Sequence, residues 1–228
     1  MIIVDTVYQR VLALANKEQR GYITPQEFNL LANQAQMEIF EQYFYDQKSE
    51  DRNLKNSTEF SNVDEMLDEK LSIFKNTQSL SVSGSIGTLP AYMYRLGSLF
   101  YASSLIEVEQ VTEEELMYLQ QSPLAKPSIY CPAFVRSGGN TVTLYPETQT
   151  IINCNYIKIP EKVNWGYSVI NDQALYNAGT SANFQLHRSD ETELVYKILS
   201  LAGIVIAKPG LGTFADGQIN AQKTQEKQ

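Results

Sequence analysis

The sequence predicts an α+β fold in which a helical bundle, formed by the N- and C-terminal helices, carries an inserted antiparallel β-rich domain. Three observations predict it. Apolar residues recur at helical spacing near both ends of the chain. Strand-like alternation with turn signals fills the middle. Capping boxes stand in both helical parts, as Thr24 with Glu27 and Asp190 with Glu193.

The predicted domain boundaries follow these changes of pattern along the 228 residues. Residues 1–78 form an N-terminal helical hairpin, a loop and a short helix. Residues 79–165 form the β-rich inserted domain, and residues 166–228 form a loop, a buried helix and a polar tail that completes the bundle.

Two helices open the chain. Asp5 can cap the first, whose apolar residues recur at three- and four-residue steps, and Gly21 is a plausible stop. Thr24, Pro25 and Glu27 together start the second. Because the connection is so short, we expect the two helices to form an antiparallel hairpin.

The pattern then changes from helix to strand. Residues 46–62 are polar without periodicity, which predicts an exposed loop, and a shorter helix follows over 63–74. In the middle of the chain we predict a strand over 79–90 and a half-buried strand over 105–111. A helix capped by Thr112 and Glu115 follows. After it we predict a hairpin over 134–146, around Ser-Gly-Gly-Asn, and a strand over 150–160.

The C-terminal part returns to helix. From Asp190 onward the residues are apolar nearly all round the helical wheel, which predicts a helix buried on several sides. Lys208, Pro209 and Gly210 end this helix. Residues 217–228 are a polar tail.

No cofactor or metal site is expected. Residues 46–59 are acidic but lack the Gly that an EF-hand loop needs at its sixth position. The glycines at 84, 87, 210 and 212 are not followed by the Lys-Ser/Thr of a phosphate-binding loop. Two cysteines and one histidine without close spacing do not make a zinc site.

No catalytic site is expected either, and we predict that the protein is not an enzyme. The single histidine, His187, could activate Cys131 or Cys154, but neither thiol has a recognisable nucleophile environment. Glu107 and Glu109 alternate on one strand, which leaves a hydrolase using these carboxylates as an alternative. Both cysteines are expected to be buried free thiols, and a single disulfide between them is the alternative.

The composition of the chain disfavours two kinds of binding partner, nucleic acids and membranes. Net charge is −8 and no run of Lys and Arg occurs, which disfavours sequence-specific nucleic-acid binding. The most apolar window, residues 198–207, is too short to cross a bilayer, and the first ten residues lack the apolar core of a signal peptide. We therefore expect a soluble protein.

The helix that begins at Thr24 carries two apolar stripes. Phe28, Leu31, Ala32, Ala35, Ile39 and Tyr43 form the first. The second, roughly opposite, consists of Leu30, Met37, Phe40 and Phe44, with a flank of amides between the stripes. Either the helix is central in its own bundle, or the second stripe or the amide flank packs on a neighbouring chain. The second stripe is accordingly the candidate subunit interface.

Several strings resemble one group of proteins. The N-terminal stretch "VDTVYQRVLALANKEQRGYITPQEFNLLANQAQMEIFEQYF" resembles the helical hairpin of structural proteins in short-tailed phages, the crAss-like phages especially. "IEVEQVTEEELMYLQQSPLAKPS", "GGNTVTLYP" and "YIKIP" are similar to the β-domain of the same group, and "LHRSDETELVYKILSLAGIVI" to its closing helix.

The resemblance implies a virion protein of the head-to-tail connector, made in the host cytoplasm, that serves as an adaptor or ring subunit without a catalytic site. It implies a closed homo-oligomeric ring of about twelve copies, joined by heterologous contacts. Its partners would be the portal, a neighbouring ring or tail proteins, with only non-specific proximity to packaged DNA and no membrane. An assembly chaperone or scaffolding factor remains an alternative, as does the hydrolase.

Overall fold

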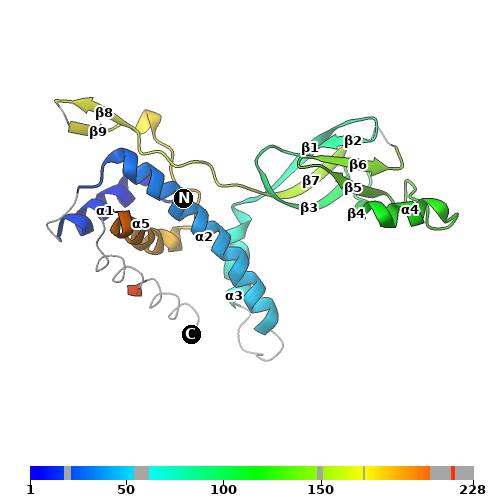
Figure 1. Cartoon of the computed structure of the whole chain (residues 1–228), viewed down its shortest axis with the longest axis horizontal. Coiled ribbons are helices and arrows are strands. Elements are labelled where there is room, and N and C mark those ends of the chain that lie inside the picture. The colour runs from blue at the N-terminus through cyan, green and yellow to red at the C-terminus, as the bar shows by residue number, and fades with distance from the viewer. Residues whose placement is uncertain (18–21, 54–61, 148–150, 172, 206–216, 219–228) are drawn as a thin grey trace. The chain divides into compact units, whose positions relative to one another are not determined.

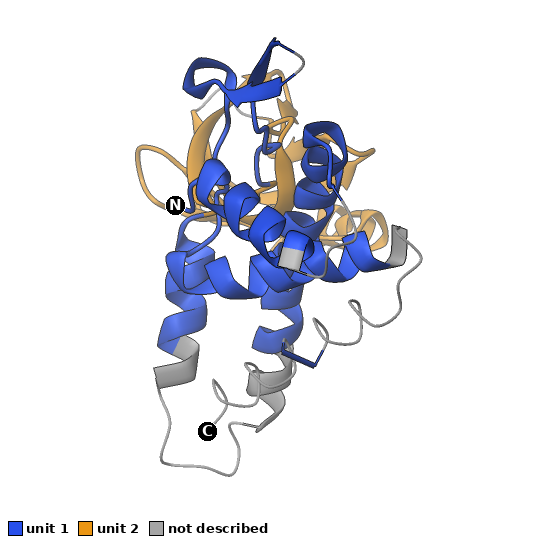
Figure 2. Ribbon diagram, turned by 90° about the vertical axis from the view of Figure 1, so that its left-hand side faces the viewer, with its two compact units in different colours: residues 1–73, 160–228 blue, residues 74–159 orange. Residues whose placement is uncertain are grey.

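The computed structural model describes residues 1–17, 22–53, 62–147, 151–171, 173–205 and 217–218. The chain divides into two compact units (Figure 2). Met1–Ile73 and Pro160–Gln228 form one of them, which we call the helical unit, and Phe74–Ile159 form the other, which we call the barrel unit. Across the described parts of the chain, no helix has the length and apolar character needed to cross a membrane.

The helical unit is built on helices from both ends of the chain. Its described elements are α1 (Val4–Lys17), α2 (Pro25–Asn53), α3 (Asn62–Ser72), α5 (Glu191–Val205), the strands β8 (Tyr167–Ile170) and β9 (Gln173–Tyr176), and the short 3₁₀ helices η1 (Ala178–Thr180) and η2 (Arg188–Asp190) (Figure 1). Helix α5 packs against α1 and α2, and α3 packs against α2. The core consists of large apolar side chains at most 2% exposed, among them Ile2, Tyr8, Phe28, Ile39, Phe40, Phe184, Leu194 and Ile198.

The start of α2 confirms the predicted capping box. The Thr24 N–H donates to Glu27 Oε2 (2.9 Å), and the Glu27 N–H donates back to Thr24 Oγ1 (3.3 Å). The predicted loop over 46–62 is wrong for its first eight residues, because α2 continues to Asn53. Polar residues with good helix propensity extend a helix that packs elsewhere, without needing apolar periodicity of their own. Residues 54–61 lie outside the described residues.

The barrel unit contains seven strands that close into a barrel in the order β1-β2-β6-β5-β4-β3-β7. Its elements are β1 (Lys75–Ser83), β2 (Ile86–Thr88), β3 (Met93–Tyr101), β4 (Glu107–Gln110), α4 (Glu113–Gln121), β5 (Ala133–Ser137), β6 (Thr141–Tyr145) and β7 (Ile152–Lys158). Antiparallel pairs make up the barrel except at β4 and β5, which pair in parallel. The predicted hairpin is confirmed as β5 and β6, with Gly138 at φ 69° in its turn.

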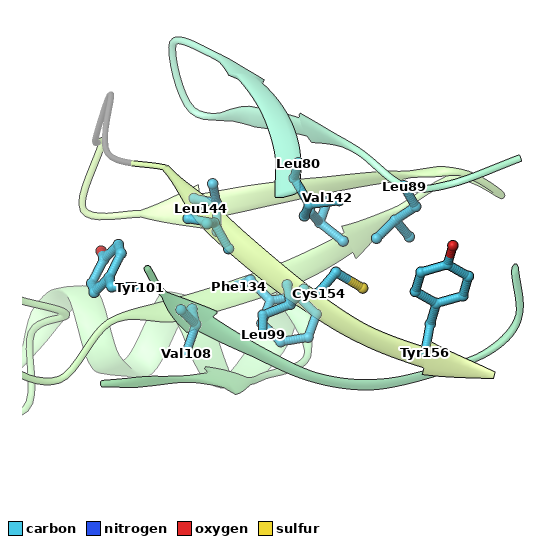
Figure 3. Packing of buried hydrophobic residues seen from close by; sticks show 11 residues of the cluster. Leu80, Leu89, Leu99, Tyr101, Val108, Phe134, Val142, Leu144, Cys154 and Tyr156 are labelled. Atoms are coloured by element: carbon cyan, nitrogen blue, oxygen red, sulfur yellow. The ribbon is translucent and has the colours of Figure 1, made fainter. Parts of the chain in front are cut away.

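Alternate residues of each strand fill the barrel (Figure 3). Ile152, Cys154 and Tyr156 of β7 point inward, as do Val142 and Leu144 of β6. In the closed barrel, the backbones of β3 and β7 approach closely at Gly97. A Cβ added at Gly97 would lie 2.8 Å from the Asn155 carbonyl oxygen, so glycine permits this close approach.

The predicted fold class is wrong. The described residues form a mixed α/β protein with five helices and a closed seven-stranded barrel, rather than an N- and C-terminal helical bundle with an inserted antiparallel β-rich domain. Period-2 alternation in the sequence shows which face of a strand is buried. It does not show which strands meet at the edges, and barrel closure depends on that pairing.

Smaller predictions also need correction. The C-terminal helix was expected to begin with Asp190 as its cap, but Asp190 is the last residue of η2, whose N-cap is His187, and α5 follows directly. Strands β3, β8 and β9 have no counterpart in the sequence-based assignment. The predicted helix stops at Gly21 and at 208–210 lie outside the described residues, as does the tail from 219.

Candidate interaction surfaces

The amides of α2 bind an extended segment of the same chain. Asn33 accepts from the Val163 N–H and donates to the Val163 carbonyl, both at 2.8 Å. In the same way, Asn29 accepts from the Trp165 N–H at 2.7 Å and donates to the Trp165 carbonyl at 3.3 Å. Gln36 donates to the Glu161 carbonyl at 2.9 Å and accepts from the backbone N–H of residue 185 at 3.1 Å. We call Asn29, Asn33 and Gln36 the amide ladder.

The geometry of the amide ladder follows from two repeat distances. Four residues of an α-helix advance about 6 Å, and two residues of an extended chain advance about 6.6 Å. Amides one helical turn apart therefore meet alternate residues of an extended segment. Each amide directs an N–H donor and its carbonyl acceptor at backbone groups, as a neighbouring strand would. The hypothesis that this flank packs on a neighbouring chain is wrong for the amide ladder, because these side chains are engaged within the chain.

The four residues of the predicted subunit interface differ in burial. Leu30 is 74% exposed. Met37 and Phe44 are half-buried. Phe40 is fully buried in the core of the helical unit and packs edge-on against Phe44, with ring centroids 5.2 Å apart. Phe40 therefore lies out of reach of a partner, and Leu30 is the residue of this set that presents most of its side chain to the surface.

The β8–β9 hairpin presents a second apolar region of the helical unit. At its base, the rings of Tyr167 and Tyr176 each lie 5.8 Å from Trp165. Trp165 is itself fixed by a hydrogen bond from Nε1 to Asp5 Oδ1 (2.9 Å) and by packing on Tyr8. The hairpin surface consists of the exposed side chains Val169, Ile170, Leu175 and Tyr176. An isolated two-stranded hairpin is marginally stable, so apolar cover from another molecule would stabilise it.

The barrel unit presents its own apolar region around α4. Leu116 is buried in a small cluster with Ala133 and Val135, which holds α4 on the outside of β5. The α4 surface, as we call it, consists of large exposed apolar side chains of α4 and of the segment that follows it, Met117, Tyr118, Leu124, Ile129 and Tyr130, with exposed fractions from 63% to 100%. Hydrogen bonds between backbone groups order the segment after α4, at 122–126 and at 128–131. An ordered apolar surface loses little conformational entropy on binding.

A buried polar cluster joins three elements of the helical unit. Lys70 Nζ of α3 lies 2.8 Å from Asp190 Oδ1 of η2, and both side chains are at most 6% exposed. The Tyr43 hydroxyl of α2 donates to the other oxygen of Asp190. Ser189 Oγ lies 3.1 Å from Asp190 Oδ1 and 2.9 Å from His187 Nδ1. The ammonium of Lys70 balances the charge of the Asp190 carboxylate, and both carboxylate oxygens have hydrogen-bond partners. This cluster therefore holds α2, α3 and η2 together.

The residues considered from the sequence as catalytic candidates belong to both units, His187 to the helical unit and Cys131, Cys154, Glu107 and Glu109 to the barrel unit. His187 caps η2 by accepting from the Ser189 N–H. Glu107 and Glu109 are exposed on β4, on either side of the buried Val108. Among the described residues, no group of three or more His, Cys, Asp or Glu side chains could hold a metal ion.

The two cysteines are free thiols in different environments. Cys154 is buried inside the barrel, as expected, whereas Cys131 is exposed, so the prediction that both are buried is wrong for Cys131. Burial raises the pKa of Cys154 to about 11.

Iodoacetamide at about pH 8 is expected to modify Cys131 and spare Cys154 in the folded protein. The thiolate is the reactive form, and the raised pKa of Cys154 leaves little thiolate at that pH. Intact-mass spectrometry should show one rapid adduct, which is absent in Cys131→Ser. Cys154 should react at least roughly a hundredfold more slowly than Cys131. Rapid addition of two adducts before unfolding would contradict the buried position of Cys154.

Comparison with known proteins adds no family to this description. No protein-family model matches the sequence, and no curated protein matches it significantly.

Proposed function

We propose that this chain is a structural subunit of the head-to-tail connector of a short-tailed phage. Copies of the chain form a closed ring of about twelve that joins the portal to the tail and extends the DNA channel. The protein is then part of the virion and its role is assembly rather than catalysis. Its partners are further copies of itself, the portal, and neighbouring ring or tail proteins.

The observation that carries this proposal is the pair of exposed apolar surfaces on separate units. The hairpin surface belongs to the helical unit and the α4 surface to the barrel unit, and both lie on ordered elements. A subunit that sits between two neighbours and also joins other components needs more than one contact surface. Large exposed apolar groups on ordered elements are typical of protein contacts. The resemblance of the sequence strings to connector proteins supports the same role.

The acidic composition fits a channel. The net charge of −8 favours a channel lumen of the same sign as the DNA phosphates, and like charge would let DNA slide without binding.

Native mass spectrometry of the purified chain, from low to high micromolar concentration, tests the proposal. We expect a discrete closed oligomer of about twelve copies. A monomer at every concentration would contradict self-assembly. Quantitative mass spectrometry of purified virions separates the ring subunit from an assembly chaperone, because the ring subunit is retained in the finished particle and the chaperone is not.

A further inference from the structure

The barrel unit is acidic beside the α4 surface. Glu107 and Glu109 lie exposed on β4, and Glu113, Glu114 and Glu115 form the exposed first turn of α4. Between residues 107 and 126, Lys126 is the one basic residue in the sequence. The exposed apolar side chains of the α4 surface therefore have glutamates beside them.

Two cations lie on the outer side of the barrel, one on β1 and one on β3, on either side of β7. Lys75 of β1 and Arg95 of β3 are both exposed and both lie opposite Ile157 of β7, one on each side. Residues directly opposite one another in a sheet project from the same face, so the two cations flank one apolar side chain. We call this region the basic face; it also includes the exposed apolar side chains Tyr92, Tyr94 and Ile159.

The acidic and basic regions lie at opposite ends of the barrel unit. Lys75 begins β1, and Arg95 lies near the start of β3, where β3 pairs with the end of β7. Strand β4 instead pairs with Leu99 and Phe100, toward the other end of β3. Figure 1 shows α4 at the end of this unit remote from the point where the chain enters β1 and leaves β7.

We propose that the α4 surface of one copy docks on the basic face of the barrel unit of the next copy. Each region pairs apolar side chains with charges, and the charges are opposite in sign, so the two regions of one chain are complementary to each other. Anionic lipids and nucleic acids are repelled by the glutamates beside the α4 surface. The occupant that fits is therefore a second copy of the chain.

This contact is heterologous, because two different regions meet. A heterologous contact propagates from copy to copy and closes into a ring when the rotation allows it. The inference thus rests on the proposed ring and names the surfaces that form it. Burial of the apolar side chains provides most of the affinity, and the charges orient the two copies and exclude the reversed pairing.

Two variants, each with one surface altered, test the contact. The α4 variant carries Leu124→Ser with Tyr130→Ser, at side chains 100% and 82% exposed. The basic-face variant carries Arg95→Glu, at an exposed position. All three side chains face solvent in the single chain, so unchanged thermal unfolding is expected and serves as the check on folding. Arg136→Glu, at an exposed position on β5 outside the basic face, is the matched charge-reversal control.

Native mass spectrometry should show that each variant requires roughly tenfold or more protein for half-assembly than the wild type or Arg136→Glu. An equimolar mixture of the two variants should give heterodimers, because one intact α4 surface still meets one intact basic face, and no ring should close. Higher ionic strength should raise the half-assembly concentration of the wild type.

Three results would overturn the inference. If both variants form the wild-type oligomer at the wild-type concentration, the ring stands but its contacts lie elsewhere. If both variants are monomeric and their mixture is too, the two surfaces do not meet each other. If the wild type is monomeric throughout, the self-contact and the self-assembling ring both fail.

Discussion

Replacing Lys70 by Met is expected to lower the free energy of unfolding by about 3–5 kcal/mol. The Lys70 ammonium lies 2.8 Å from a carboxylate oxygen of Asp190, and the Asp190 side chain is 1% exposed. Methionine fills a similar volume but leaves the Asp190 carboxylate buried without its counter-ion. The Tyr43 hydroxyl still donates to Asp190, but a hydrogen bond does not replace the missing charge.

Chemical denaturation followed by the fluorescence of Trp165 measures this loss. Trp165 is the single tryptophan and belongs to the helical unit, so its signal reports the unit that contains Lys70. The matched control is Lys197→Met. The ion pair of Lys197 with Glu38 (2.9 Å) is partly open to solvent, because the Lys197 side chain is 26% exposed and the Glu38 side chain is 36% exposed. That control should cost no more than about 1 kcal/mol.

A double-mutant cycle gives a second readout. In Lys70→Met with Asp190→Asn the buried charge is absent, so the combined cost should be smaller than the sum of the two single costs. Equal losses for Lys70→Met and Lys197→Met, or a fully additive cycle, would show that the buried ion pair does not hold α3 to η2.

Replacing Asn33 by Leu is expected to destabilise the helical unit by about 2–4 kcal/mol. Asn33 binds both backbone groups of Val163 at 2.8 Å, and Val163 is 2% exposed. Leucine has a similar size but no polar atoms, so the Val163 N–H and carbonyl both lose their partner. Each such unsatisfied group costs about 1–3 kcal/mol.

The control for Asn33→Leu is Gln34→Leu on the same helix. Gln34 is exposed and donates to Glu38, one helical turn away (3.0 Å), and among the described residues it makes no bond to another element. The change should therefore stay within about 0.5 kcal/mol. Trp165 fluorescence again reports the transition, and the Asn29 bonds to Trp165 make this probe sensitive to the amide ladder. Comparable effects of the two changes would show that the amide ladder does not stabilise the extended segment.

Local features of the fold could be predicted from the sequence because they depend on residues close together in the chain. The capping boxes of Thr24 and Thr112 each need a Glu three residues on, and both form. The hairpin of β5 and β6 follows from its Gly-Gly turn and alternating flanks. The apolar face of α5 predicted burial, and Leu194, Ile198 and Ala202 are at most 1% exposed.

Other features depended on residues far apart in the chain. The amides of α2 marked a polar flank, but their partners at 161–165 lie more than 120 residues away. Asp190 has the local signature of a helix cap, and that signature does not reveal its contacts with the ammonium of Lys70 and the hydroxyl of Tyr43. Lys70 lies on α3 and Tyr43 on α2, so these contacts depend on tertiary packing rather than on the residues next to Asp190.

The candidate surfaces divide in the same way. Sequence periodicity placed Phe40 on a second stripe that faces a partner, but the structure buries it and leaves Leu30 exposed. By itself the sequence determined where most helices begin, where the β5–β6 hairpin turns and which residues are apolar, because these depend on local backbone and side-chain chemistry. Only the tertiary structure decided that seven strands close into a barrel, that the hairpin and α4 surfaces remain uncovered, and that acidic and basic regions stand at opposite ends of one unit. Those outcomes depend on which distant segments pair and which face each one buries.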